Sequence, residues 1–550
     1  MKRSILSLVL IIISNLTFSQ SKPNILWMVA EDISLDLSMY GDTIANTPNL
    51  DELALEGMIY DNAFAPVGVC APSRSAIITG MYPTSIGTMH MRTGLDVGGW
   101  GKRMYNPNPS QKRIDVNDNA IPEYSAVIPS EVKCFTEYLR AAGYFCTNNS
   151  KTDYQFAAPI TSWDENGNQA HWRNRKNEQP FFSVFNFNVT HESRLWMNVD
   201  KELTVSPDDV TVPPYLQDTQ KVRNDIARHY SNIELMDDQI AKIIDQLKED
   251  GLYDNTIIFF YSDHGGPLPR EKRAIYDSGL KVPLIIKDLD GKTKGRMDDL
   301  ISFVDFAPTL LSLAGIKPPN YIDGKPFMGS FKKELNEYVF GSSDRFDEFS
   351  DRSRAIRTKD FLYVKNYYPN KIKYKDVGYR KQIPMMVEFL ESKENGELNE
   401  EQETWFTTKT EEELYNVKED PYQMHNLISD PNFKKQLNEL QKMYDKYQKK
   451  HEDFGEVPEL EMVQKMWPDL KQPITALPRV KQTGNSIRIS CETKGASIAY
   501  IISDSLMENY DYNSDWQLYS EPFNATSGKY LYLVSERIGY KASDIVIHKL

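Results

Sequence analysis

The sequence has fewer basic than acidic residues. Its 64 Lys and Arg residues are outnumbered by 78 Asp and Glu residues, which gives a formal net charge of −14. A nucleic-acid partner requires a basic surface, so this composition argues against nucleic acid as a ligand. It does not exclude an anionic substrate, because a local group of Lys, Arg and His can focus positive potential inside an acidic protein.

Long apolar runs are equally scarce. Residues 5–13 (ILSLVLIII) follow the basic pair Lys2 and Arg3, are too short to span a bilayer, and precede a small-residue segment that ends at Ser19. This pattern is typical of a signal peptide over residues 1–19, so we expect cleavage near Ser19 and export to a periplasm or out of the cell. No later run is long enough for a membrane helix, and we expect no membrane span.

Cysteine is also rare, with four residues in 550. This excludes a small scaffold held together by many disulfides. In an exported chain Cys134 and Cys146 could form one bridge, but the segment between them is typical of a helix, and both could equally be buried thiols. Cys70 lies in a different kind of segment, described below.

Three predominantly apolar runs predict buried strands of a parallel sheet: Asn24–Ala30, 180–189 and 256–261. Residues 225–251 have apolar side chains at helical spacing and predict a long amphipathic helix. From residue 474 onward, short alternating runs separated by Gly, Asn, Asp and Ser predict a small all-β sandwich. A chain of this length exceeds one ordinary core, so we expect two or three domains with an α/β domain first.

Each predicted parallel strand is followed by polar residues. Glu31 and Asp32 follow the first, His191 the second, and Asp263 and His264 the third. Carboxyl ends of parallel strands meet at one edge of a sheet, where open α/β sheets bind ligands. Carboxylates there suit a hard cation and a histidine suits acid/base work, although an acid that caps a turn and a histidine in a plain loop are the alternatives.

The segment from Val69 to Arg74 predicts a loop that closes into a helix. Cys70 lies at the expected helix start, Pro72 suits a first helical turn, and Ser73 can cap it. A helix N-terminus attracts anions, and Arg74 adds a permanent cation. From these residues alone, Cys70 is either a buried thiol at a tight turn or part of an anion site.

Cys70, Pro72, Ser73 and Arg74, followed by Thr79-Gly80, resemble the signature of the type I, formylglycine-dependent sulfatases of the alkaline phosphatase superfamily. The resemblance implies that a maturation enzyme converts Cys70 to formylglycine, whose hydrate attacks the sulfur of a sulfate ester. It also implies a calcium ion held by Glu31, Asp32, Asp263 and residue 70, with His264 offering either a nitrogen ligand or a sulfate contact. Glu31 stands where relatives usually have aspartate, but its carboxylate is still a hard oxygen donor.

The resemblance extends to the substrate side of the site. It assigns Arg74, Lys151 and Lys272 to the sulfate charge and His191 to protonation of the leaving group. Asp153 stands where many members have histidine, which leaves its role open. We also consider His90, Arg92 and Arg345 as substrate contacts, with a surface-loop position as the alternative for His90 and a solvated charge cluster as the alternative for Arg345.

The expected organisation is an α/β fold whose central, mostly parallel sheet is flanked by helices, with a smaller α+β C-terminal subdomain and an appended all-β sandwich. The domains are a signal peptide at 1–19, a catalytic domain at 20–345, a sulfatase C-terminal subdomain at 346–465, and a sandwich at 472–550 that resembles modules appended to chitobiase-like glycosidases.

The segments around Lys151 and Asp263 most resemble the branch of N-sulfoglucosamine sulfohydrolases and polysaccharide sulfatases. The expected function is therefore an exported sulfatase acting on a sulfated polysaccharide or its oligosaccharides, either an algal glycan such as ulvan or a glycosaminoglycan. One alternative is a phosphodiesterase or phosphonate hydrolase of the same superfamily. The other is a non-catalytic glycan-binding protein on a decayed sulfatase fold.

Overall fold

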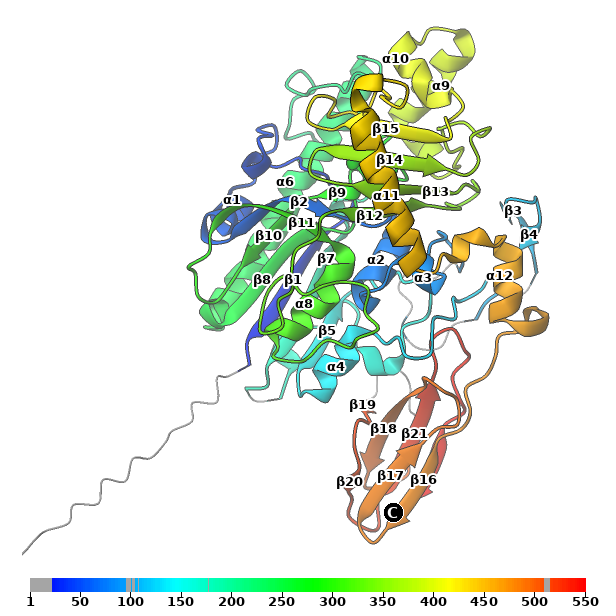
Figure 1. Cartoon of the computed structure of the whole chain (residues 1–550). Coiled ribbons are helices and arrows are strands. Elements are labelled where there is room, and N and C mark those ends of the chain that lie inside the picture. The colour runs from blue at the N-terminus through cyan, green and yellow to red at the C-terminus, as the bar shows by residue number, and fades with distance from the viewer. Residues whose placement is uncertain (1–21, 95–99, 101–103, 107, 177, 509–514) are drawn as a thin grey trace, which may run out of the picture.

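The computed structural model describes residues 22–550, apart from 95–99, 101–103, 107, 177 and 509–514 (Figure 1). The predicted signal peptide at residues 1–19 lies outside the described residues. Among the described residues, no helix is both long and apolar enough to cross a membrane. Cys134 and Cys146 are both buried and are not joined by a disulfide.

The central sheet is built around β1 (Asn24–Ala30), which pairs in parallel with β7 (Phe181–Phe187) and β8 (Thr256–Ser262). Strand order is β11-β2-β10-β8-β1-β7-β5-β6, with β9 beside β2. Strand β10 runs antiparallel to its neighbours β2 and β8, and β9 runs antiparallel to β2, whereas the other pairings are parallel. The bounds of these further strands are β2 (Met58–Phe64), β5 (Phe145–Asn149), β6 (Glu165–Asn166), β9 (Lys281–Val282), β10 (Leu284–Lys287) and β11 (Gly295–Ser302).

Alternate residues of β1 enter two separate cores, as the pleat of a strand requires. Trp27 and Val29 pack on the face covered by α2 (Cys70–Thr79), α4 (Phe135–Ala141) and α8 (Phe306–Leu313). Leu26 and Met28 pack on the face covered by α1 (Pro48–Glu56) and α6 (Gln220–Glu249). This is the predicted mostly parallel sheet between helices, and α6 begins before the predicted residue 225 because Thr219 caps it, its side chain accepting from the Val222 N–H.

A second, antiparallel sheet lies above the first in Figure 1 and is crossed by α11 (Lys434–Lys450). Its strands are β12 (Val339–Ser343), β13 (Ser353–Arg357), β14 (Phe361–Asn366) and β15 (Glu412–Asn416). Between β14 and β15 the chain forms α9 (Pro384–Asn395) and α10 (Glu400–Glu403), and after α11 it forms α12 (Glu459–Met466). The remaining short elements are α3 (Pro83–Ile86), β3 (Ser110–Ile114), β4 (Ala120–Ile121), α5 (Arg194–Met197) and α7 (Asp277–Leu280).

The chain ends in two small antiparallel sheets, which we call the C-terminal sandwich (Figure 1). One contains β16 (Arg479–Thr483), β17 (Ser486–Ser490) and β20 (Phe523–Asn524); the other contains β18 (Ser497–Ser503), β19 (Gln517–Leu518), β21 (Tyr530–Glu536) and β22 (Val546–Lys549). Ile487 and Ile489 of the first sheet share a core with Leu531 and Leu533 of the second. The fold class is therefore as predicted, including the appended all-β unit.

The C-terminal sandwich is fastened to the α/β domain by polar contacts. Lys133 Nζ donates to the Gly495 carbonyl at 2.7 Å and to Ser497 Oγ at 2.8 Å, and Arg140 Nη2 donates to the Trp516 carbonyl at 2.9 Å. Gly495 has a φ of +79°, and a Cβ there would lie 2.2 Å from the Ser130 carbonyl oxygen. Such close backbone approach requires glycine, so the two backbones pack closely at this interface.

Glu536 makes this interface sensitive to pH. Its carboxylate accepts the Ile160 N–H at 2.6 Å, while burial raises its pKa to about 7 and the nearby Glu137 adds to the shift. The folded-state pKa exceeds the unfolded value, so this group stabilises the fold below about pH 4.5 and loses that contribution as pH rises to about 7. We expect Glu536→Gln to raise the melting temperature relative to wild type at pH 8 but not at pH 4.5.

Thermal denaturation of the full chain at both pH values measures this difference. Glu521→Gln removes an exposed carboxyl from the same sandwich and is expected to keep the wild-type profile. An equal effect of Glu536→Gln at both pH values would show that the carboxyl does not titrate with folding.

Candidate active site

Helix α2 begins at Cys70, and all its residues are buried. The predicted cap at Ser73 is wrong: Val69 is the N-cap residue and no side chain caps the helix. Ser73 Oγ instead donates to the Asp263 carbonyl at 2.6 Å. The hydroxyl therefore ties the helix that carries Cys70 to the chain segment that follows β8.

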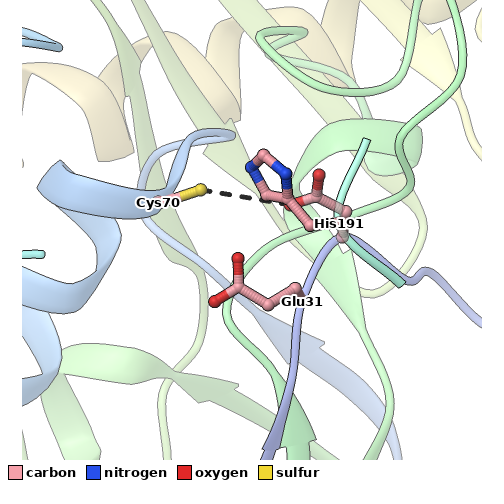
Figure 2. Close-up of side chains that lie close together, drawn as sticks. Glu31, Cys70 and His191 are labelled. Atoms are coloured by element: carbon pink, nitrogen blue, oxygen red, sulfur yellow. Dashed lines mark hydrogen bonds between the residues drawn. The ribbon is translucent and has the colours of Figure 1, made fainter. Parts of the chain in front are cut away.

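The acids predicted at strand ends come together in front of Cys70. Glu31 and Asp32 follow β1 and Asp263 follows β8, and all three side chains are 0% exposed. Their proximity follows from the parallel register that pairs Ala30 with Ser262. Cys70 Sγ lies 3.3 Å from His264 Nε2 and 4.0 Å from Asp32 Oδ1. Figure 2 shows Cys70, Glu31 and His191 reaching toward one common space.

Three cations surround these carboxylates, each from a different segment. Arg74 donates to Glu31 at 2.6 Å and to Asp263 at 3.0 Å, so one guanidinium bridges both strand ends. Lys151 Nζ lies 2.6 Å from Glu31, and Lys272 Nζ lies 2.6 Å from Asp32. Buried charges are costly unless they are paired in this way, so each of these cations offsets the burial of a carboxylate.

The pKa shifts follow from these pairs. Burial would raise the pKa of Asp32, but the Lys272 charge, together with His264, holds it well below its usual value. The pKa of Asp263 is lowered in the same way, against its burial, chiefly by His264 and Arg74. Burial would lower the pKa of His264, but Asp263 and Asp32 outweigh it and raise that pKa to about 10. Close carboxylates and an imidazolium therefore share one buried site.

His191 occupies the opposite wall. Its Nδ1 accepts the Ser193 N–H at 3.3 Å, which leaves the proton of the neutral ring on Nε2. Burial and the Lys272 charge lower the pKa of His191 to about 3. The ring is therefore a neutral hydrogen-bond donor at the pH values where proteins work.

Two charged residues at this site, Glu192 and Arg273, were not predicted from the sequence. Glu192 accepts two 2.9 Å hydrogen bonds from Arg273 and lies 3.3 Å from Lys272 Nζ. Its backbone N–H donates to Asp32 Oδ2 at 2.7 Å. The Glu192–Arg273 pair thus helps to hold Asp32 and Lys272 in position, through the Glu192 N–H and the Glu192 carboxylate. Their only sequence signal is that each directly follows a residue we did select, His191 or Lys272.

Arg92 and Asp153 lie beside helix α2. Their side chains pair at 3.5 Å, and both line a small cavity that also borders Ala71. Both residues have left-handed φ angles, as do Asp32, Arg273 and Asp347. Non-glycine residues in this region are strained, and such strain concentrates at functional sites.

His90 and Arg345 are placed differently from the predicted substrate contacts. Arg345 is 1% exposed, with Nε and Nη2 bound to Glu459 of α12 and Nη1 bound to the carbonyls of Met91 and Asp347. His90 Nδ1 accepts the Arg345 N–H at 3.3 Å, and the ring is buried. Four of the five guanidinium N–H groups of Arg345 are bonded within the protein, so its geometry is that of a structural residue, and His90 belongs to the same buried network.

The donor set fits a hard divalent cation. Two overlapping groups place their ligand atoms within 4.8 Å of one another: Glu31, Asp32, Cys70 and His191 in one, and Asp32, Cys70, Asp263 and His264 in the other. Three carboxylates supply the oxygen ligands that such cations prefer, whereas a sulfur and an imidazole nitrogen are softer ligands. The carboxylates therefore form the core of a candidate metal centre.

Comparison with known proteins agrees with this geometry. The family model described as Sulfatase matches residues 23–316, and the model described as N-sulphoglucosamine sulphohydrolase, C-terminal, matches residues 270–402. An ulvan-active sulfatase of Formosa agariphila is 43% identical over 564 residues, covering 96% of this chain and 91% of that protein.

Solved structures share the fold. A putative sulfatase from Bacteroides thetaiotaomicron has a TM-score of 0.55 at 18% identity, covering 78% of this chain and 93% of that one. A phosphonate monoester hydrolase from Silicibacter pomeroyi also has a TM-score of 0.55, at 14% identity, covering 79% of this chain and 96% of that one. The fold alone thus serves both sulfate and phosphonate esters, but sequence similarity separates them: the chain belongs to the family of formylglycine-dependent sulfatases and is a sulfuric ester hydrolase.

Proposed function

We propose that this chain is an exported, periplasmic or secreted sulfatase that removes sulfate from a sulfated polysaccharide or its oligosaccharides, with ulvan as the first candidate. The observation that carries the substrate class is the 43% identity to an ulvan-active sulfatase over 96% of this chain. A glycosaminoglycan is the second candidate, favoured by the match of residues 270–402 to the C-terminal model of N-sulphoglucosamine sulphohydrolase.

The proposed nucleophile is residue 70 after a maturation enzyme has oxidised its thiol to the aldehyde formylglycine. One hydroxyl of the aldehyde hydrate attacks sulfur, and the sugar oxygen leaves. Loss of a proton from the second hydroxyl then expels sulfate and restores the aldehyde. An unmodified thiol would form a thiosulfate ester, which has no second hydroxyl to expel the sulfate. Cys70 is buried and its Sγ lies 3.3 Å from His264 Nε2, which supports a chemical role for this position.

The proposed cation is calcium, held by Glu31, Asp32 and Asp263 with residue 70 and His264 at its border. When bound, it would act as a Lewis acid on a sulfate oxygen. Arg74, Lys151 and Lys272 pair with these carboxylates and add positive charge where the sulfate would lie. Such preorganised charge is most effective when charge builds up in the transition state.

His191 is the proposed donor to the departing sugar oxygen. Its neutral ring carries the proton on Nε2, and it shares the space in front of Cys70 (Figure 2). Arg92 and Asp153, at the small cavity beside Ala71, are proposed to contact the sugar through a cation and an acceptor. Arg345 and His90 have no place in this proposal, because Arg345 is held by Glu459 and the buried His90 accepts the Arg345 N–H through Nδ1.

We expect the purified, matured protein to release sulfate from ulvan oligosaccharides faster than from glycosaminoglycan oligosaccharides. We also expect hydrolysis of an aryl sulfate to exceed that of the matching aryl phosphate or phosphonate. Ion chromatography of released sulfate and phosphate measures both comparisons, and Cys70→Ala protein gives the background. Faster phosphonate hydrolysis would favour the superfamily alternative, and glycan binding without sulfate release would favour a non-catalytic protein.

A further inference from the structure

A second charged cavity lies between the Lys272 loop and the segment that joins β14 to β15. Its volume is about 30 Å³. Its lining is dominated by cationic side chains, with two carboxylates among them: Arg270, Lys272, Arg273, Lys373, Lys375, Arg380 and Lys409, against Asp351 and Glu413. Lys272 and Arg273 form ion pairs with Asp32 and Glu192 of the active site. The remaining cations of the lining belong to the cavity alone.

Arg380 is a buried cation in the lining of the cavity. It is 2% exposed, and its Nε is buried without a hydrogen-bond partner among the described residues. Nη2 donates to the Lys272 carbonyl at 2.9 Å, and the guanidinium carbon lies 5.2 Å from the Trp405 ring centroid. No described carboxylate lies within ion-pair distance of Arg380. A buried cation with neither a counter-charge nor a partner for its Nε is costly, so Arg380 requires a further acceptor.

The two carboxylates of the lining are already committed. Asp351 is shared by Lys375, at 3.2 Å, and Lys409. Glu413 accepts hydrogen bonds from neutral donors: the Tyr276 hydroxyl at 2.9 Å, the Asn366 amide at 2.7 Å and the Tyr415 hydroxyl at 2.7 Å.

The remaining cations therefore exceed the available negative charge. Arg270 donates to the carbonyls of Tyr422, at 2.7 Å, and Gln423, at 2.8 Å. Neither Arg270 nor Lys373 has an ion pair among the residues that the structure describes. With Arg380, these cations give the cavity a surplus of positive charge. Such a potential favours an anion.

We propose that this cavity binds a small monoatomic anion, with chloride as the occupant in ordinary salt solutions. About 30 Å³ exceeds the roughly 10–15 Å³ that one water molecule requires, so the cavity has room for one monoatomic ion. Water could satisfy Arg380 Nε but would leave the charge surplus in place. Because Arg380 also holds the Lys272 carbonyl, the anion would stabilise the loop that presents Lys272 to the active site.

Bromide tests the site directly, because it replaces chloride and scatters anomalously. We expect crystals of the full chain grown with sodium bromide to show an anomalous peak in the cavity next to Arg380. A cavity that holds only water, with bromide confined to the protein surface, would overturn the proposal.

A measurement in solution separates specific binding from general salt effects. At constant ionic strength, we expect sodium chloride to raise the melting temperature of the wild-type chain above its value in sodium gluconate by roughly 2 °C or more. Arg380→Met should abolish this difference, and Lys373→Met, a milder change in the lining, should reduce it. Lys381→Met removes an exposed cation from the next position and should preserve it. No chloride effect in the wild type, or the same effect in wild type and all three variants, would refute the site.

Discussion

Replacing Cys70 with alanine is expected to lower kcat/KM for sulfate esters by at least about 10⁴-fold, because it removes the group proposed to form the covalent intermediate. Folding should be preserved. The side chains that anchor α2, including Ile77 and Ile78, are untouched, and so is the hydrogen bond from Ser73 to Asp263. We expect melting temperatures of variant and wild type to agree within a few degrees.

The matched control is Cys491→Ala, which removes a thiol from the C-terminal sandwich and should leave activity unchanged. Mass spectrometry of the peptide that contains residue 70 completes the test. Active wild-type protein should lack the mass of unmodified cysteine there, and protein expressed without a maturation enzyme should be folded but nearly inactive. Full activity from protein with an unmodified Cys70 would contradict the formylglycine mechanism.

Removal of the divalent cation is expected to have the second largest effect. Chelation should lower sulfate release by at least about 10²-fold, because the proposed Lewis acid supplies several kcal/mol of charge stabilisation. Calcium should restore the activity better than magnesium. The donors lie on three separate chain segments, and calcium tolerates irregular coordination that magnesium does not.

Two variants sharpen the metal test. Asp263→Asn removes one buried carboxylate charge and should abolish the rise in melting temperature that calcium gives the wild-type protein. Asp290→Asn changes an exposed carboxyl outside the site and should retain that rise. Full activity in chelated protein whose metal content is shown to be below one ion per chain would exclude a metal-dependent reaction.

The carboxyl ends of β1, β7 and β8 could be predicted from sequence because burial on both faces makes each strand predominantly apolar. The polar residues after such a run mark its approximate end, although the predicted run at 180–189 extends two residues past the observed end of β7 at Phe187. Glu31, Asp32, His191 and Asp263 were found this way, and the parallel register brings them together. Lys151 and Lys272 lie in loops without such a pattern, so only the family resemblance could point to them.

The roles of residues whose partners are distant in the sequence could not be predicted from local sequence patterns. Arg345 follows β12 and looks available in the sequence, but its carboxylate partner Glu459 lies 114 positions later. Ser73 has the composition of a cap, yet its hydroxyl bonds to Asp263, 190 positions away. Glu192 and Arg273 were not predicted, because their role depends on the ion pair between them. No local sequence spacing relates residues that are 81 positions apart.

The close packing of the C-terminal sandwich against the α/β domain also affects how the chain would bind a polymeric substrate. A binding module on a flexible tether samples many positions, and its benefit depends on the effective concentration that the tether provides. Lys133, Arg140 and the close approach of Gly495 to Ser130 remove that freedom. A glycan strand touching both the sandwich and the reaction centre would be held at one spacing and one angle, so the interval between its sulfate groups would decide which of them is cut.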